Sequence, residues 1–383
     1  MRSFEPEDRR GHRILFTPGP LTTTRTVKEA MLIDIGSWDR DCVELVRDIR
    51  GKLSSLARGP ADLTVTLFQG SGSYAVEAVL GSALPPGAKL LVLENGAYGK
   101  RMVLTAAALK IPAVVLEDPE DRPHDPRAVG AALDADPAIT HVACVHCETT
   151  SGVLNPIREI GLEVGRRGRR FLVDAISSFA AYPSGPGQPI DFEAGPIDHL
   201  VSTANKCLEG VPGIAFVISR REAVQEAEGR ARSLCLDLHG QWSNLEKSGQ
   251  FRYTPPTHVL LALAQALVEL KAEGGVEARC RRYRENHRIL LAGMRELGFR
   301  PYVPEEFQSH VITTFHYPHP QFDFRAFYDR LHARGFIIYP GKLTSADTFR
   351  IATIGSIGGG EVRALLAAIG DLVREGIGGP KVA

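Results

Sequence analysis

Short apolar runs alternate with helical patterns through the middle of the 383-residue chain, and this alternation constrains the fold more than any other feature. Strands that alternate with helices of about 10–15 residues form βαβ units, whose strands lie parallel in one sheet. Several of the runs are apolar at successive positions, as expected for strands covered on both faces. The expected strands span residues 65–68, 89–93, 113–116, 141–145, 170–173, 199–202 and 214–218.

The pattern of expected helices and strands changes after Gly274 and Gly275. Before this pair we expect helices at 73–82, 99–109, 126–135, 156–167 and 256–274. After it come a long charged helix at 276–297, sparser strands at 311–315 and 336–339, and a final helix at 360–376. We therefore expect an α/β protein with a large domain at 13–275, built on a mostly parallel central sheet covered by helices. A smaller α+β domain at 276–383 and an N-terminal segment at 1–12 complete the prediction.

The composition excludes several classes of protein. Lys and Arg total 45 and balance 45 Asp and Glu, so no overall field attracts nucleic acid or an anionic membrane. No apolar run reaches the roughly 18 residues of a membrane span, and the charged N-terminus lacks the core of a signal peptide. The six cysteines are scattered, which predicts reduced thiols and a cytoplasmic location. Cys144 and Cys147 form a C-x-x-C pair, but no second pair follows at zinc-site spacing, so we expect no metal.

A small, hydroxyl-rich turn follows the first expected strand and opens a helix. Free N–H groups at such a helix start bind anions, and the hydroxyls of Ser71 and Ser73 add donors. The spacing Gly70-x-Gly72-x-x-Ala75 also fits a dinucleotide fingerprint, so an oxidoreductase is an alternative at this point. The hydroxyls favour a phosphate monoester over a buried pyrophosphate.

Three other strand ends carry an aromatic ring, a carboxylate and a lysine. Tyr98 lies in a glycine-flanked turn, where its ring could stack on a planar ligand. Asp174 ends a buried strand and needs a cationic partner there. Lys206 and Lys342 are the two of the chain's ten lysines that follow strands on turns. With the phosphate turn, this set fits pyridoxal 5′-phosphate: Lys206 forms the Schiff base and Asp174 keeps the pyridine nitrogen protonated.

Longer motifs give the chain a family resemblance over nearly its whole length. They include H-C-E-T-T at 146–150, V-D-A-I-S-S at 173–178, N-K-C at 205–207 and Y-P-G-K at 339–342. With these motifs the chain resembles the class V, fold-type I aminotransferases. The resemblance implies a transaminase that depends on pyridoxal 5′-phosphate and works by a ping-pong mechanism as a homodimer. Within the family it is most similar to members that convert 2-aminoethylphosphonate and pyruvate to phosphonoacetaldehyde and alanine.

The resemblance also assigns roles to single residues. It makes Lys206 the catalytic lysine and Asp174 the partner of the pyridine N–H. Arg350 would hold the anionic end of the substrate, with Gly19 beside it. Thr254 would reach the cofactor phosphate of a neighbouring subunit. The implied cofactor-binding residues are Ser71, Gly72, Ser73, Tyr98, Thr149, Asp174, Ile176, Lys206 and Thr254.

Two departures from the family pattern lie near the expected substrate anions. Residues 351–356 read I-A-T-I-G-S where the family usually has I-G-N-I-G-E, and the stretch 247–253 is shortened and altered. A related class V enzyme that uses alanine or serine with glyoxylate, or a close aminophosphonate analogue, is therefore an alternative. A lyase or desulfurase with the same cofactor and a non-enzymatic binding module are others. A desulfurase needs a mobile nucleophilic cysteine, and neither Cys207 nor Cys235 lies in a recognisable loop of that kind.

Overall fold

The fold is described from a computed structural model, in which residues 13–343 and 346–377 are described. The expected N-terminal segment, 1–12, and the last six residues of the expected C-terminal domain lie outside this range.

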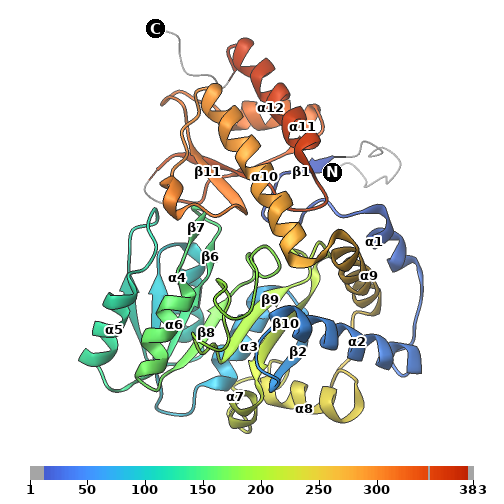
Figure 1. The fold of residues 1–383 in the computed structure, drawn as a ribbon, viewed down its shortest axis with the longest axis vertical. Helices are drawn as coiled ribbons and strands as arrows, with labels where there is room; N and C mark the ends of the chain where they lie inside the picture. The colour runs from blue at the N-terminus through green and yellow to red at the C-terminus, as the bar shows by residue number, and fades with distance from the viewer. Residues whose placement is uncertain (1–12, 344–345, 378–383) are drawn as a thin grey trace.

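A seven-stranded sheet lies at the centre of the larger part of the molecule (Figure 1). Its strand order is β2-β10-β9-β8-β5-β3-β4, and each neighbouring pair is parallel except the two pairs that include β10. This confirms the prediction of a mostly parallel α/β sheet. The strands are β2 (Leu63–Gly70), β3 (Lys89–Glu94), β4 (Ala113–Glu117), β5 (Ile139–Val145), β8 (Arg170–Asp174), β9 (His199–Thr203) and β10 (Gly213–Arg220).

Helices cover both faces of this sheet, which explains why its strands are apolar at successive positions. In β3, Leu91 and Leu93 pack into the cluster that holds α2, α5, α6 and α9, whereas Leu90 and Val92 pack against α3 and α4. Burial of alternate side chains on opposite faces follows from the two-residue period of a strand. The helices of this part are α1 (Arg25–Glu29), η2 (Ala30–Leu32), α2 (Arg40–Ala57), α3 (Gly72–Ala83), α4 (Ala97–Ala108), α5 (Pro126–Ala135), α6 (Ile157–Arg166), α7 (Arg221–Glu226), α8 (Leu238–Ser248) and α9 (Thr257–Glu273).

A smaller α+β part is built from the C-terminal third of the chain. Its three-stranded antiparallel sheet has the order β11-β14-β13, and its core is rich in phenylalanine. Its elements are α10 (Gly275–Glu296), η3 (Glu305–Phe307), β11 (Ile312–His316), α11 (Phe324–Ala333), β12 (Phe336–Ile337), β13 (Tyr339–Pro340), β14 (Thr348–Ala352) and α12 (Gly359–Arg374). The division of the chain at residue 275 stays a prediction.

The beginning of the described chain packs against this C-terminal part. β1 (Ile14–Leu15) pairs in parallel with β12, and Phe16 joins the same core as Phe349. The expected strand at 336–339 is two short strands, because β12 pairs with β1 and β13 pairs with β14. The segment before α1 therefore contacts both parts, because Phe16 lies in the C-terminal core and Gly19 lies against the Lys206 loop.

Several elements are absent from the predictions above. The longest is α2, which is rich in charged residues and has only a narrow apolar stripe of Cys42, Val46, Ile49 and Leu53. The helices α8 and α11 and the strand β14 were also missed, as was the small hairpin of β6 (Cys147–Glu148) and β7 (Val153–Leu154).

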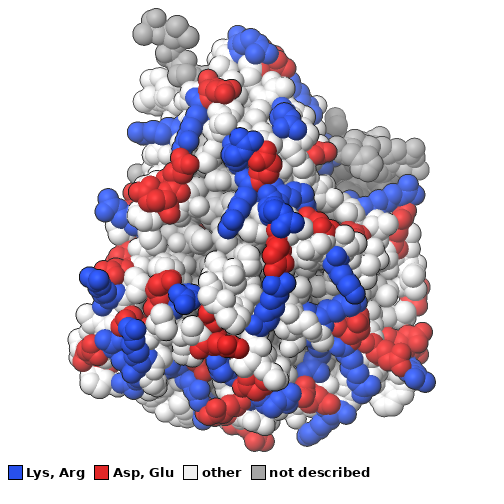
Figure 2. Space-filling model, in the orientation of Figure 1, with Lys and Arg blue, Asp and Glu red and all other residues white. Residues whose placement is uncertain are grey.

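The surface carries both signs of charge. Lys and Arg side chains are interspersed with Asp and Glu over the face drawn in Figure 2. Exposed side chains of opposite charge form ion pairs, such as Arg288 with Glu285. In the described part of the chain, no helix is long and apolar enough to cross a membrane. The same residues hold no group of three or more His, Cys, Asp or Glu side chains placed to bind a metal ion.

Candidate active site

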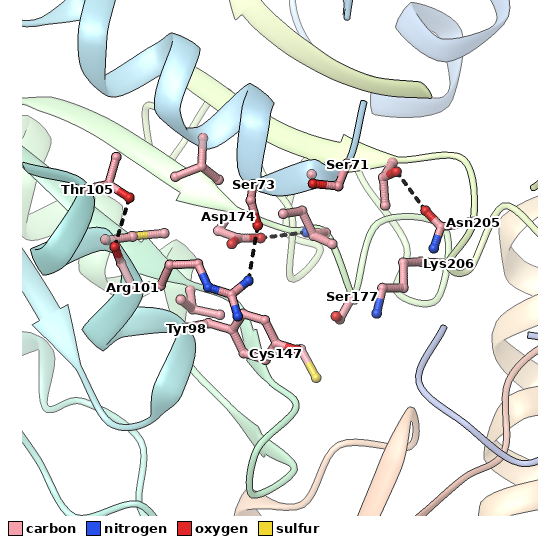
Figure 3. A pocket seen from close by; sticks show the side chains of 16 residues that line it. Ser71, Ser73, Tyr98, Arg101, Thr105, Cys147, Asp174, Ser177, Asn205 and Lys206 are labelled. Atoms are coloured by element: carbon pink, nitrogen blue, oxygen red, sulfur yellow. Dashed lines mark hydrogen bonds between the residues drawn. The ribbon is translucent and has the colours of Figure 1, made fainter. Parts of the chain in front are cut away.

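A cavity lies beyond the carboxyl ends of β5, β8 and β9, which is where ligands bind in open parallel sheets (Figure 3). Lys206 follows β9, Asp174 ends β8, and the start of α3 and of α4 complete the walls. The cavity gathers seven of the residues expected from the sequence, namely Ser71, Gly72, Ser73, Tyr98, Asp174, Ile176 and Lys206.

Lys206 is a half-buried amine in the loop between β9 and β10. Its Nζ donates a hydrogen bond to the carbonyl oxygen of Pro18. The pKa of Lys206 is lowered from 10.5 to about 8, mainly by burial and to a smaller extent by the charge of Arg350, while Cys207 and Asp174 oppose the shift. A lysine whose pKa is brought near neutrality is a better nucleophile and can exchange protons.

Gly19 lies directly against the Lys206 side chain. A Cβ at this position would be 2.6 Å from Cδ of Lys206 and 2.9 Å from the carbonyl oxygen of Asn205. The φ angle of Gly19 is +117°, which is also unfavourable for a residue with a side chain. The segment before α1 therefore forms one wall around the lysine, and only glycine fits at its closest point.

Asp174 is a buried carboxylate, 7% exposed. One of its oxygens accepts a hydrogen bond of 2.9 Å from the backbone N–H of Ile176. The pKa of Asp174 is raised from 3.8 to about 7, mainly by burial and to a smaller extent by the neighbouring Glu148, although the hydrogen bond from Ile176 opposes the shift. No cation among the described residues forms an ion pair with Asp174, so this group can take up a cationic N–H from a ligand.

The turn at the start of α3 has the features of an anion site. Ser71 is the N-cap residue, its hydroxyl makes no capping hydrogen bond, and the first turn of α3 holds no acidic residue. A Cβ on Gly72 would collide with Cδ1 of Ile176, so the turn packs closely against the segment after Asp174. Arg101 donates a 3.0 Å hydrogen bond to Oγ of Ser73. These hydroxyls and helix N–H groups fit a phosphate.

The turn of Tyr98 is held by the buried carboxylate of Glu148, to which the sequence analysis assigned no role. The backbone N–H of Tyr98 donates to Glu148, and Thr150 donates to the same carboxylate through its backbone and its hydroxyl. Glu148 is fully buried, and burial raises its pKa. The turn that carries the Tyr98 ring is therefore fixed to β6.

Arg350 and Thr149 are not among the residues that line the cavity, but they contact each other, and Arg350 lies near enough to Lys206 to affect its pKa. Nη1 of Arg350 donates a 2.9 Å hydrogen bond to the carbonyl oxygen of Thr149, and Nε donates to Pro340. Arg350 is 2% exposed, and burial lowers its pKa. The hydroxyl oxygen of Thr149 is buried and has no hydrogen-bond partner in the described structure.

Thr254 lies apart from the cavity within its own chain. It is exposed, and it lines a different hollow together with Trp38 and Tyr253. The sequence reading also missed Arg101, whose guanidinium lies 4.8 Å from the centre of the Tyr98 ring. Residues three apart share one face of a helix, so the spacing of these two on α4 was the available signal.

Comparisons with known proteins agree with this geometry. Residues 35–354 match the family described as aminotransferase class-V. The chain is 52% identical over 360 residues to a 2-aminoethylphosphonate–pyruvate transaminase of Syntrophobacter fumaroxidans, covering 94% of this chain and 95% of that one. It is 51% identical to the protein of the same name from Salmonella schwarzengrund, covering 93% and 96%. A solved structure of an alanine–glyoxylate aminotransferase from Nostoc sp. has a TM-score of 0.87 at 23% identity, covering 97% of this chain and 98% of that one, which shows a shared fold.

Proposed function

The chain belongs to the class V aminotransferase family, and we propose that it is a transaminase that moves the amino group of 2-aminoethylphosphonate to pyruvate. The observation that carries the proposal is the meeting of Lys206, Asp174 and the Ser71 turn in one cavity. The expected fold-type I architecture is confirmed.

Pyridoxal 5′-phosphate is the cofactor of this activity, and the residues present fit it. The Thr149 hydroxyl is buried, has no hydrogen-bond partner among the described residues, and can bond the ring hydroxyl. Asp174 is a buried carboxylate that forms no ion pair with any described residue, and it can receive the pyridine N–H. Tyr98 and Ile176 line the same cavity and can contact the ring, and Ser71 and Ser73 can hold the phosphate.

Lys206 is the proton carrier of the proposed reaction. When bound, the cofactor supplies an aldehyde carbon that takes the amine covalently and a ring that withdraws electrons from the adjacent substrate carbon. Nζ of Lys206 removes the proton from that substrate carbon, and a pKa near 8 lets the same nitrogen accept and release it. Asp174 keeps the ring nitrogen protonated, which maintains the withdrawal of electrons.

Arg350 orients the substrates through their anionic ends. One half of the reaction presents a phosphonate and the other a carboxylate, and a guanidinium can donate two parallel hydrogen bonds to either. The hydrogen bonds from Arg350 to Thr149 and Pro340 fix the guanidinium in place. The buried position of this cation raises the cost of leaving it unpaired and so favours anionic substrates.

The proposal is tested with a panel of amine donors and pyruvate as acceptor, using enzyme reconstituted with the cofactor. We expect 2-aminoethylphosphonate to give the highest kcat/KM and to yield phosphonoacetaldehyde and alanine. Lys206→Ala should abolish turnover, and borohydride reduction of the wild type should attach a pyridoxyl group to Lys206. Arg350→Ala should mainly raise KM for both substrates. A clear preference for serine or alanine with glyoxylate would contradict the substrate assignment.

We further propose that the enzyme is a homodimer in which Thr254 completes the phosphate site of the partner subunit. Trp38 is 85% exposed and Tyr253 is 49% exposed, and both line the hollow that holds Thr254. Exposed aromatic side chains of this kind are typical of interfaces. Mixing Lys206→Ala and Thr254→Val protomers tests this, because a mixed dimer would regain one intact site. No recovery of activity in mixed dimers would refute a shared site.

We also propose that the protein works in the cytoplasm. All six cysteines are free, and five of them are buried. Free thiols in this number suit a reducing compartment. Cys207 is buried, donates a hydrogen bond to the carbonyl oxygen of Ser177, and has its thiol pKa raised by burial, so it lacks the mobility of a desulfurase nucleophile.

A further inference from the structure

Lys342, the last residue of the Y-P-G-K motif, has no role in the reaction described above. Its Nζ lies 6.0 Å from the centre of the Tyr98 ring, and the Arg101 guanidinium lies 4.8 Å from the same ring. Arg350 lies close enough to Tyr98 for the two to interact electrostatically. Three cationic side chains, Lys342, Arg101 and Arg350, therefore lie near one aromatic ring, which itself lines the cavity.

The fold places Lys342 next to Arg350. In the antiparallel pair of β13 and β14, Tyr339 lies opposite Arg350, so the turn at 341–342 begins directly beyond this pair. The backbone N–H of Gly341 donates a 2.9 Å hydrogen bond to the carbonyl oxygen of Thr348, and a Cβ on Gly341 would collide with that oxygen. Arg350 itself donates to the carbonyl oxygen of Pro340. The motif thus forms a tight turn that is bonded to the arginine.

The positive charges of this group are not neutralised by the surrounding protein. Among residues 13–343 and 346–377, no carboxylate forms an ion pair with Lys342, Arg101 or Arg350. Burial lowers the pKa of Lys342, and the like charges of Arg350 and Arg101 lower it further. Two acids lie nearby without forming an ion pair with these cations: Asp174 is near Arg101, and Glu148, near Lys342 and Arg350, already accepts hydrogen bonds from Tyr98 and Thr150. An anion bound here would relieve this repulsion.

We propose that Lys342 and Arg350 form a two-cation subsite that selects the phosphonate group over a carboxylate. This rests on the proposed function. A phosphonate, like a phosphate monoester, offers three acceptor oxygens and up to two negative charges, whereas a carboxylate offers two oxygens and one charge. Arg350 can bind two oxygens of either group, and Lys342 supplies a donor and a charge for the third oxygen of the phosphonate. The carboxylate half-reaction then requires only Arg350.

The test compares Lys342→Gln with the wild type in both half-reactions. In a ping-pong enzyme, kcat/KM for each substrate reports its own half-reaction. We expect kcat/KM for 2-aminoethylphosphonate to fall about tenfold, the size of a charge-assisted contact, and that for pyruvate to fall less than about twofold. Lys342→Arg should retain most of the phosphonate activity. Lys100→Gln is the matched control, because Lys100 is also near the Tyr98 turn but pairs with Glu94 at 3.5 Å.

A second measurement separates this proposal from the proposed function. Inhibition constants of ethylphosphonate and propanoate, which lack the amine, should differ in the wild type, and Lys342→Gln should reduce that difference about tenfold. Equal losses for the two inhibitors, or no loss, would overturn the role of Lys342. If the wild type failed to convert 2-aminoethylphosphonate, the proposed function would fall, while the inhibitor preference would still report on Lys342.

Discussion

Glu209→Gln should destabilise the protein through the loop that carries the catalytic lysine. Glu209 is 3% exposed, its φ angle is +63°, and its N–H donates a 2.8 Å hydrogen bond to the carbonyl oxygen of Lys206. Its carboxylate accepts hydrogen bonds from Tyr283 and Arg282 of α10. The loop of Lys206 is therefore fastened to the first helix of the C-terminal part.

The cluster around Glu209 holds two glutamates and two arginines. Arg279 lies between Glu209 at 3.6 Å and Glu273 at 2.8 Å, and it also donates to the carbonyl oxygen of Cys207. Arg282 bonds both glutamates and the carbonyl oxygens of Gly355 and Ile357, which follow the strand of Arg350. The cluster thus joins the lysine loop to the turn after β14.

The expected loss follows from the charge left behind. The Glu209→Gln side chain keeps an acceptor oxygen but loses the negative charge. Arg279, which is 2% exposed, and Arg282 then share one remaining carboxylate, that of Glu273. Breaking a buried ion pair on one side costs about 3–5 kcal/mol, and the remaining Glu273 places the change at about 3 kcal/mol. An unfolding entropy of about 2.1 cal/mol/K per residue gives about 0.8 kcal/mol/K for 383 residues, so Tm should fall by about 4 °C.

Differential scanning calorimetry of the reconstituted enzyme measures this shift. Glu285→Gln is the control, because Glu285 lies on the same helix and pairs at 2.7 Å with Arg288, but both side chains are exposed. Its Tm should change by no more than about 1 °C. If the two variants lowered Tm equally, or if Glu209→Gln left Tm unchanged, the buried ion pairs of Glu209 would not stabilise the folded protein.

Two further predictions concern the cavity. In cofactor-free protein, the pKa of Asp174 is about 7 when folded and 3.8 when unfolded, so wild-type stability declines as pH rises from about 4 to 7. Asp174→Asn removes this loss. The Tm of the variant relative to the wild type should therefore rise as pH increases from about 4 to 7 and stay constant above pH 7. A difference in Tm that did not depend on pH would contradict the burial argument. The same variant should bind the cofactor more weakly, as absorbance titration would show. Gly19→Ala should lower kcat at least about tenfold, because its Cβ would meet Cδ of Lys206 at 2.6 Å and a backbone oxygen at 2.9 Å; a wild-type kcat would show that the wall can move freely.

Much of the cavity could be predicted because its residues follow local rules. Each of Ser71, Tyr98, Asp174 and Lys206 lies within a few residues of the end of a predicted strand, and parallel strands bring their carboxyl ends to one edge of the sheet. Each side chain could therefore be assigned to the same edge without any knowledge of long-range contacts. The family motifs then supplied the roles that the types of residue alone left open.

Other residues depend on contacts between distant parts of the chain. Pairing of β1 with β12 brings Pro18 and Gly19 to Lys206; the family resemblance placed Gly19 in the site, but no local pattern indicates that it lies against the lysine. The missed helix α2 has few apolar residues, so its burial depends on the sheet against which it packs. The position of Thr254 relative to a partner subunit is a property of an assembly and stays a prediction.

The sequence by itself determined the parallel sheet, which strand ends carry site residues, and that these residues include a lysine, a carboxylate and a phosphate-binding turn. These features follow from short-range periodicity and composition. Only the tertiary structure decided which cations surround Tyr98, how Glu209 ties the lysine loop to α10, and that Gly19 forms the wall behind Lys206. Those arrangements arise where separate parts of the chain pack together, and the free energy of such packing depends on all the partners at once.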